Sequence, residues 1–386
     1  MLDSSSIFCP DRGMSDATPS PHRQQLLLVG NGDAHLHVAS HAHQLAQAGI
    51  DVTLITPQPF AFADWLGGML GGEWQLDDVH LPASRITAHG ATHVAASVVA
   101  ADRSNRRVTL DNGQRLDYDW LSIDLPPVVD AQAIPGFYTA QGIYGASADS
   151  LWALRQQLES ELADPARRLS NVAVLGGGAL GVELAANLLA LGERYGRPLP
   201  VALIGNERQP LPDACRRANR WLTRRLQRRG LRLELVATAA RYERDSLILD
   251  DGTAVDADLL LVVEALRPPP AFDVFGLAHD AQGRVEVDPR QRCREDPRVF
   301  VNQPSAPGKT TRRATRERAT GLLSALLALG DAPTPARTHD SHWKALNLGD
   351  LRDIAWRGSL WCRGRWVRRL KHRRDRREVA RYLDDT

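Results

Sequence analysis

The stretch from Asn171 to Leu189, NVAVLGGGALGVELAANLL, decides the fold of this chain. A strand-forming apolar run meets Gly176-Gly177-Gly178-Ala179-Leu180-Gly181, and a helix-forming run follows at once. In this G-x-G-x-x-G pattern Gly176 permits the tight turn, Gly178 lets a pyrophosphate approach the backbone, and Gly181 lets helix and strand pack closely. The helix N-terminus then presents free N–H groups to the phosphates. The alternative is an ordinary βα turn that merely needs glycines, but the strand–turn–helix context favours a dinucleotide site.

The composition is typical of a globular protein that contains two or three domains. Of its 386 residues, 43% are hydrophobic and 24% are charged, and a net charge of +2 hides a concentration of arginine near the C-terminus. No apolar run is long enough to span a bilayer, and we expect no signal peptide. The four cysteines form no C-x-x-C pair, which predicts a reducing cytoplasm and no dithiol redox centre.

Another strand–turn–helix unit, the first along the chain, lies near the N-terminus. The apolar run Leu26–Val29 meets Gly30-Asn31-Gly32-Asp33-Ala34-His35, so His35 stands where the third glycine is expected. One helix ending at Gly49 and a strand ending at Thr56 should follow, and Thr56 replaces the acid that usually binds ribose. Alone this motif is weak. Paired with the Gly176 motif, it predicts an architecture with two dinucleotide sites, the first formed by Gly30, Gly32, His35 and Thr56.

The alternation of strands and helices along the chain predicts an α/β fold with two Rossmann-like, doubly wound parallel sheets. Short alternating runs with an Asn112-Gly113 hairpin signal precede a Pro/Gly-rich linker over residues 132–145. The expected division is a disordered N-terminus (1–23), a first dinucleotide-binding domain (24–130 and 266–335), a second one (145–265), and a basic, Trp-rich C-terminal segment (336–386).

Four histidines near the first motif raise the question of a metal site. His37 and His41 would share one face of a helix, as two zinc ligands do, and His35 and His43 lie nearby. No further ligands accompany them, so we interpret them as polar residues of an outer helix face and predict no metal.

Several segments of the sequence together resemble a known family. They are LLLVGNGDAHLHV, DVTLITPQPF, LDYDWLSID and VAVLGGGALGVELAANL, with the tail from Lys344 to Tyr382. The chain resembles the FAD- and NAD(P)-binding pyridine nucleotide oxidoreductases, especially type II NADH dehydrogenases and the flavoprotein domain fused to selenide, water dikinase. The resemblance implies FAD at the first motif and NAD(P)H at the second, with Glu183 near the nicotinamide.

Three departures from the family pattern fall on loops that should touch FAD. Pro126-Pro127 replaces a flexible Gly-Ser or Thr-Gly, and Glu264-Ala265-Leu266 replaces Ala-Thr-Gly. Asn302-Gln303 stands where a Gly-Asp is expected. The flavin side is therefore degenerate and the nicotinamide side is intact, which predicts weak or substoichiometric FAD.

The resemblance implies an NAD(P)H oxidoreductase that passes electrons through FAD to a quinone or another small acceptor. The sequence identifies no catalytic acid or base. A degenerate, non-catalytic protein that binds nucleotide or serves as a scaffold is the alternative. Glu207 favours NADH and Arg208 favours NADPH, so the choice between them stays open.

The C-terminal segment places Trp356, Trp361 and Trp366 among arginines. Interfacial tryptophans and clustered arginines are typical of peripheral contact with an anionic membrane, here at the inner face. The alternative is that the tryptophans pack on the protein and the arginines face water. A nucleic-acid partner is not expected, because solvated arginine faces are far commoner than RNA-binding ones. A homodimer is an open expectation.

Overall fold

A computed structural model describes residues 23–140, 142–264, 266–281, 283–303, 312–329 and 343–383. The predicted N-terminal segment lies outside these residues, except for Arg23. Residues 336–342, at the start of the predicted C-terminal segment, also lie outside them.

The first sheet has five parallel strands in the order β20-β9-β1-β2-β5. These are β1 (Gln24–Val29), β2 (Ile50–Ile55), β5 (Ala91–Val94), β9 (Trp120–Ile123) and β20 (Val299–Val301). Because all five are parallel, the loops after β1, β2, β9 and β20 meet at one edge of the sheet. This edge is where the first glycine motif lies.

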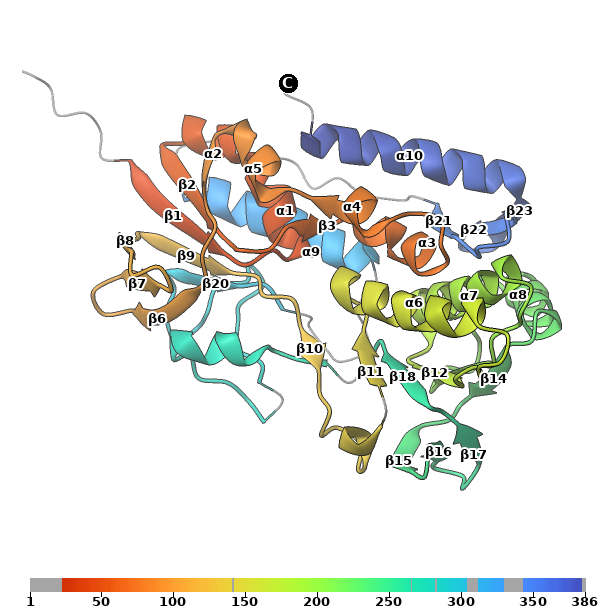
Figure 1. Cartoon of the computed structure of the whole chain (residues 1–386). Coiled ribbons are helices and arrows are strands. Elements are labelled where there is room, and N and C mark those ends of the chain that lie inside the picture. Colours follow the sequence, from red (N-terminus) through yellow and green to blue (C-terminus); the bar gives the residue numbers. More distant parts are fainter. Residues whose placement is uncertain are drawn as a thin grey trace, which may run out of the picture.

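Three helices accompany this sheet: α1 (Asp33–Ala39), α2 (Ala42–Gln47) and α9 (Arg312–Leu327), of which α1 and α9 pack against each other (Figure 1). The prediction of one helix from the first motif to Gly49 is wrong. Ser40 donates a hydrogen bond to the carbonyl of His37 (2.9 Å), and Nδ1 of His41 lies 2.8 Å from the same oxygen. Such side-chain bonds compete with the backbone ladder and separate α1 from α2.

The second sheet is also parallel, in the order β11-β18-β12-β13-β14. Its strands are β11 (Gly142–Gly145), β12 (Val172–Leu175), β13 (Val201–Gly205), β14 (Arg232–Leu235) and β18 (Leu259–Val262), and its helices are α6 (Ala148–Ala163), α7 (Gly178–Arg194) and α8 (Arg216–Arg228). The expected linker therefore ends in a strand, because β18 supplies a partner for residues 142–145.

Smaller elements connect and flank the sheets. Two antiparallel sheets comprise β6 (Val98–Asp102), β7 (Arg107–Leu110) and β8 (Arg115–Asp117), and β15 (Ala239–Glu243), β16 (Ser246–Leu249) and β17 (Ala254–Asp256). Two further pairs are β3 (Phe60–Ala61) with β4 (His80–Leu81), and β10 (Val128–Val129) with β19 (Leu266–Arg267). The short helices are α3 (Leu66–Leu70), α4 (Leu76–Val79) and α5 (Ala83–Ile86). Gly113 has a φ of 83° in the β7–β8 turn, which confirms the predicted hairpin.

The C-terminal segment forms a small antiparallel sheet followed by one long helix. Its elements are β21 (Lys344–Leu346), β22 (Asp353–Arg357), β23 (Leu360–Gly364) and α10 (Arg365–Leu383). Figure 1 shows α10 extending from β23 past the helices of the first sheet. Trp356 and Trp361 are paired across β22 and β23, and Trp366 lies in the first turn of α10. The three tryptophans spaced five residues apart are therefore divided between a hairpin and a helix.

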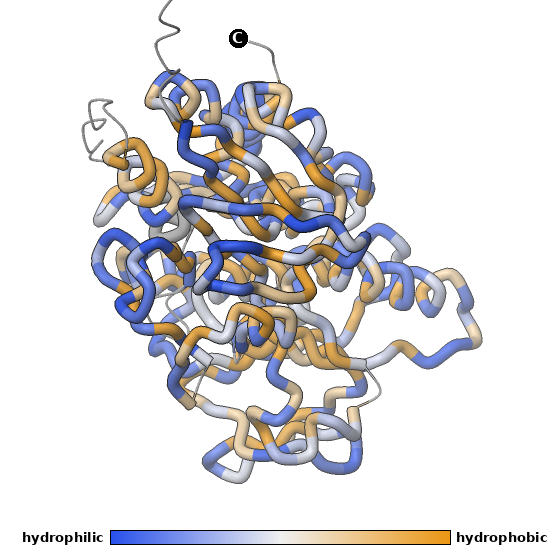
Figure 2. Tube along the Cα trace, turned by 90° about the vertical axis from the view of Figure 1, so that its left-hand side faces the viewer, coloured by the Kyte–Doolittle hydropathy of each residue, from blue (hydrophilic) through white to orange (hydrophobic). Residues whose placement is uncertain are grey.

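The core lies along the strands of the two large sheets. All four residues of β12 and all four of β18 are buried, as sequence hydrophobicity predicted. Figure 2 shows hydrophobic segments in the interior and hydrophilic turns at the periphery. The chain thus has the predicted α/β fold with two Rossmann-like units and a small C-terminal segment.

Candidate functional site

The second glycine turn, Gly176–Gly181, has glycines in the conformations that the motif requires. Gly176 has a φ of 124° and Gly178 a φ of 73°, both in the region that disfavours other residues. A Cβ on Gly181 would lie 1.9 Å from the carbonyl oxygen of Gly176. Helix α7 therefore packs against the turn at a distance that only glycine permits.

The N-terminus of α7 is open to a ligand. The N-cap is Gly177, and among the described residues no side chain accepts a hydrogen bond from the N–H groups of Gly178, Ala179 or Leu180. A Cβ on Gly178 would meet nothing nearer than Oε1 of Glu207, at 3.9 Å. The first N–H groups of this 17-residue helix are therefore available to an anionic group.

Two carboxylates border this second turn. A Cβ on Gly177 would lie 1.9 Å from Oε2 of Glu207, and one on Gly205 would lie 2.9 Å from the same atom, so Glu207 folds back over the end of β13. This Oε2 is buried and has no hydrogen-bond partner among the described residues. The Glu264 carboxylate accepts a hydrogen bond from the N–H of Gly177. Burial, with the nearby Glu207 charge, raises the pKa of Glu264 to about 7.

The first glycine turn, Gly30–His35, differs because the chain's own Asp124 occupies it. Oδ2 of Asp124 accepts hydrogen bonds from the N–H groups of Ala34 (2.9 Å) and His35 (3.1 Å) at the start of α1. A Cβ on Gly32 would lie 2.2 Å from the Asp124 carboxylate. The space that Gly32 leaves is thus filled by this side chain, which is 5% exposed.

Asp124 is held in place from a second direction. Nδ2 of Asn302 donates to Oδ1 of Asp124 (2.7 Å), and the backbone N–H of Asn302 donates to the carbonyl of Ile123 (2.9 Å). The loops after β9 and β20 are therefore joined across the carboxyl edge of the first sheet. The sequence pattern singled out Asn302 but not Asp124, although an acid directly after a buried parallel strand was an available signal.

His35 fills the position of the missing third glycine. Its ring is fully buried, with Nδ1 3.0 Å from the carbonyl of Gly30 and Nε2 2.9 Å from the hydroxyl of Ser122. Burial lowers the pKa of His35, so the ring is neutral. Thr56, also predicted to bind cofactor, uses its hydroxyl locally, where it donates to the carbonyl of Gln58 (3.1 Å).

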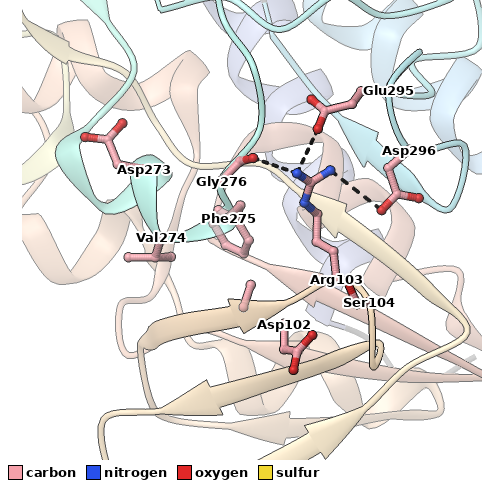
Figure 3. A pocket seen from close by; sticks show the side chains of 10 residues that line it. Asp102, Arg103, Ser104, Asp273, Val274, Phe275, Gly276, Glu295 and Asp296 are labelled. Atoms are coloured by element: carbon pink, nitrogen blue, oxygen red, sulfur yellow. Dashed lines mark hydrogen bonds and ion pairs between the residues drawn. The ribbon is translucent and has the colours of Figure 1, made fainter.

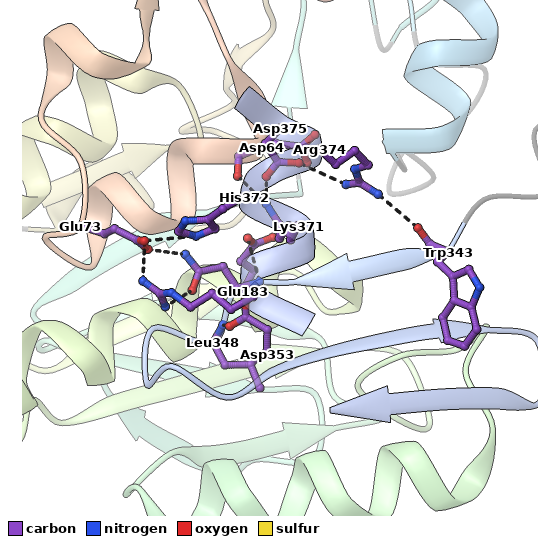
Figure 4. Close-up of polar contacts among 12 residues, drawn as sticks. Asp64, Glu73, Glu183, Trp343, Leu348, Asp353, Lys371, His372, Arg374 and Asp375 are labelled. Carbon is purple, nitrogen blue, oxygen red and sulfur yellow. Dashed lines mark hydrogen bonds and ion pairs between the residues drawn. The ribbon is translucent and has the colours of Figure 1, made fainter. Parts of the chain in front are cut away.

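Glu183 lies on α7 beneath the C-terminal segment (Figure 4). It is fully buried, and its Oε1 accepts a hydrogen bond from the backbone N–H of Asn347 (3.3 Å). A Cβ on Gly67 of α3 would lie 2.8 Å from its Cγ. Its side chain is thus enclosed by α3 and the loop after β21, and its role near a nicotinamide stays a prediction.

A polar cluster fixes α10 against the rest of the molecule (Figure 4). Glu73 pairs with Arg368, and Nε2 of His372 lies 3.2 Å from the same carboxylate. Lys371 forms a buried ion pair with Asp375 (2.6 Å) and donates to the carbonyl of Asp64 (3.1 Å). The C-terminal segment is therefore a fixed part of the fold.

An acidic pocket lies apart from both turns, between β6 and the 3-10 helix Pro270–Phe275 with the following Gly276 (Figure 3). It has a volume of 660 Å³, and Arg103 crosses it to the carbonyl of Gly276 (2.7 Å) and to Glu295 (2.8 Å). None of its lining residues belongs to a glycine turn. Among the described residues no three His, Cys, Asp or Glu side chains are placed to hold a metal ion.

Residues 24–302 match the family model described as pyridine nucleotide-disulphide oxidoreductase. The chain belongs to this family. The match spans both glycine turns and confirms the family that the sequence words predicted.

Individual relatives are distant. The chain is 23% identical over 308 residues to demethylphylloquinone reductase of Synechocystis sp., covering 77% of this chain and 74% of the relative. It is 26% identical over 256 residues to an assimilatory nitrate reductase electron transfer subunit of Bacillus subtilis, covering 64% of this chain but only 31% of the relative. The structure of a sulfide:quinone oxidoreductase from Aquifex aeolicus shares the fold, with a TM-score of 0.73 at 15% identity over 93% of this chain and 91% of that one.

Family membership implies FAD and a pyridine nucleotide as cofactors, and the two turns fit them unequally. The second turn fits a dinucleotide, because among the described residues no side chain bonds the first N–H groups of α7 and Gly178 faces open space. The first turn fits the FAD pyrophosphate only if the Asp124 side chain moves out of it. The Asp124 carboxylate already accepts the N–H groups of Ala34 and His35 that the phosphates would use.

Proposed function

We propose that this chain is a FAD-dependent NAD(P)H oxidoreductase that passes electrons to a small acceptor. The observation that carries the proposal is the open second turn, with the glycines at Gly176, Gly178 and Gly181 and an uncapped α7 behind them. Family membership supports the same reaction class. FAD, when bound, supplies the redox chemistry between the nicotinamide and the acceptor.

Glu207 supports NADH as the preferred nucleotide. Its carboxylate lies at the end of β13 beside Gly177, where an acid accepts hydrogen bonds from the ribose hydroxyls. The buried Oε2 has no hydrogen-bond donor there among the described residues. A 2′-phosphate would meet this negative charge, and Arg208, which is exposed, would have to compensate for it.

We infer that FAD is held weakly, because it has to displace Asp124 from the first turn. A quinone is the acceptor best supported, since the relatives include a demethylphylloquinone reductase. The test is NADH oxidation by the purified chain with a soluble quinone, with and without added FAD. We expect oxidation that rises with FAD concentration and saturates. NADH binding without quinone reduction at saturating FAD would contradict the proposal.

The position of Asp124 favours a second candidate function, that of a nucleotide-binding protein without a working flavin. The hydrogen bonds from Ala34, His35 and Asn302 all stabilise the closed first turn. In that case the second turn would bind NADH and the chain would take up no flavin at millimolar FAD. Flavin absorbance in excess of the surrounding dialysate, after equilibrium dialysis against FAD, separates the two candidates.

We propose that the outer face of α10 contacts the inner membrane surface from the cytoplasm. Trp366 (52% exposed) and Leu370 (55%) lie one turn apart, with Leu360 (63%) on the preceding hairpin. Arg369, Arg373 and Arg377 are exposed on the same face. This combination of arginines and exposed apolar residues suits an anionic interface. No helix of the described residues is long and apolar enough to cross a bilayer.

Co-sedimentation with vesicles tests this contact. The wild type should pellet with phosphatidylglycerol vesicles, less so as salt increases, whereas Trp366→Ser combined with Leu370→Ser should stay in the supernatant. Val99→Ser, which removes an exposed apolar side chain on β6, is the matched control and should pellet normally. A wild type that stays in the supernatant at low salt would contradict the contact. The predicted domain bounds and the homodimer stay proposals.

A further inference from the structure

A groove between α8 and β23 is lined by seven arginines and two tryptophans and has a volume of 420 Å³. Figure 1 shows α8 and the C-terminal hairpin on the same side of the molecule. No acidic residue is among those that line it, and none of its residues belongs to a glycine turn. The net charge of the whole chain is only +2, so this is a strong local concentration of positive charge.

The floor of the groove is rigid. Arg225 pairs with Asp350, and Arg229 pairs with Glu193 (2.7 Å) while donating to the carbonyl of Leu348 (2.7 Å). The guanidinium of Arg363 lies over the ring of Trp221, 4.9 Å from its centroid. These contacts fix several guanidinium groups before any ligand arrives, which lowers the entropy lost on binding.

The rim consists of arginines that have no ion-pair partner among the described residues. Arg217, Arg220, Arg224 and Arg228 recur at spacings of three and four residues, so they share one face of α8. All four are exposed, and no carboxylate of the described residues forms an ion pair with them. Like charges at this spacing repel one another, and a bound anion would relieve the repulsion.

The chemistry of the lining selects the kind of anion. Arginine and tryptophan side chains offer only hydrogen-bond donors, so the lining side chains present no acceptor. An acidic peptide would bring N–H groups that this surface cannot satisfy. A phosphate presents only acceptor oxygens, which match the guanidinium fork in bidentate geometry.

The length of the groove selects several phosphates over one. The rim from Arg217 to Arg228 spans eleven steps of α8, about 16 Å at the helical rise of roughly 1.5 Å per residue. A single phosphate cannot reach both ends. A single-stranded nucleic acid would also use open aromatic faces to stack its bases, but Trp221 and Trp361 pack near each other (6.0 Å between centroids) and Arg363 lies over both.

We propose that this groove binds a linear polyphosphate-type anion. The inference does not rest on the proposed oxidoreductase activity, because the groove and the glycine turns share no residue. Binding is expected to weaken steeply with salt, since each contacted phosphate releases counterions.

Isothermal titration with inorganic tripolyphosphate tests the proposal on the full chain at low salt. The wild type should bind, and Arg220→Glu combined with Arg224→Glu should bind at least tenfold more weakly. The control, Arg115→Glu combined with Arg290→Glu, makes the same charge change at exposed arginines outside the groove and should bind like the wild type. NADH affinity should be equal in all three proteins, which checks that the variants are folded.

Three outcomes would overturn the proposal. They are no tripolyphosphate binding by the wild type at low salt, equal loss in the groove variant and the control, and tighter binding of a single-stranded RNA oligomer than of a polyphosphate with the same number of phosphates. The last result would assign the groove to nucleic acid.

Discussion

The two glycine turns of this chain begin with the same kind of sequence and end in opposite states. At the second turn Glu207 lies against Gly177, but Gly178 faces open space and no side chain of the described residues bonds the N–H groups of Gly178 or Ala179. At the first turn Asp124 accepts the N–H groups of Ala34 and His35, and Asn302 holds it there. The first turn thus pairs the N–H groups at the start of its helix with a carboxylate, whereas the second turn pairs only the N–H of Gly177, with Glu264.

The largest expected effect is that of Gly178→Val on the open turn. The new side chain would lie in the path of the pyrophosphate, and we expect NADH affinity to fall by at least about 100-fold, or roughly 2.7 kcal/mol. Fluorescence titration measures it. Gly196→Val is the matched control, because Gly196 has a similar φ of 65° and a Cβ there would have no atom within 4 Å. Equal loss in both variants would show that backbone strain, not the site, is responsible.

The closed turn should open in Asp124→Ala. Removing the carboxylate frees two N–H groups for the phosphates, and we expect FAD affinity to rise about 30-fold, or roughly 2 kcal/mol. The variant should also unfold more easily, by about 1 kcal/mol, because α1 loses its cap. Asp119→Ala is the control, since Asp119 accepts a hydrogen bond from the N–H of Gln25 (2.9 Å) near the start of β1. If titration with FAD gives the same affinity for Asp124→Ala and the wild type, Asp124 does not close the first turn.

Glu264 should make the open turn sensitive to pH. Above about pH 7 its carboxylate is ionised and repels the pyrophosphate, and below that pH it is protonated and neutral. NADH affinity should therefore rise as pH falls through this range, by up to about tenfold per pH unit. Glu264→Gln should abolish the dependence and bind NADH tightly at alkaline pH. Calorimetry at several pH values decides, and a pH dependence that persists in the variant would exclude Glu264 as its source.

The smallest effect is expected from Glu207→Ala. If Glu207 accepts hydrogen bonds from the ribose, the variant should lose about fivefold of its preference for NADH over NADPH. The ratio of the two dissociation constants measures this, and Glu243→Ala, an exposed acid on β15, should leave the ratio unchanged. An unaltered ratio in Glu207→Ala would leave nucleotide choice to Arg208.

Sequence patterns correctly predicted the structural features that are determined by residues close together in the sequence. The strand, turn and helix around Gly176 follow from local apolar runs and glycines, as does the hairpin at Asn112-Gly113. The family pattern also located Asn302 as a departure near the flavin. The Gly176 unit and the hairpin depend on short-range propensity, which a single sequence carries, whereas Asn302 stood out only against the family pattern.

Features that depend on distant partners were missed. Asp124 reaches the N–H of Ala34 from 90 positions away, a contact that no local pattern encodes. The glycine-rich run at residues 142–145 becomes a strand only because β18 pairs with it. Glu183 meets the C-terminal segment at Asn347, 164 positions later, so its enclosure was equally hidden.

The flavin content of the purified wild-type chain shows directly whether the first turn is closed while the second is open. Protein should be passed through gel filtration and its flavin absorption compared with the protein concentration, alongside an NADH titration of the same sample. We predict well under one flavin per chain, with FAD binding at least about tenfold more weakly than NADH, because Asp124 occupies one turn while the other is open. One tightly held flavin per chain after gel filtration would contradict this difference between the turns.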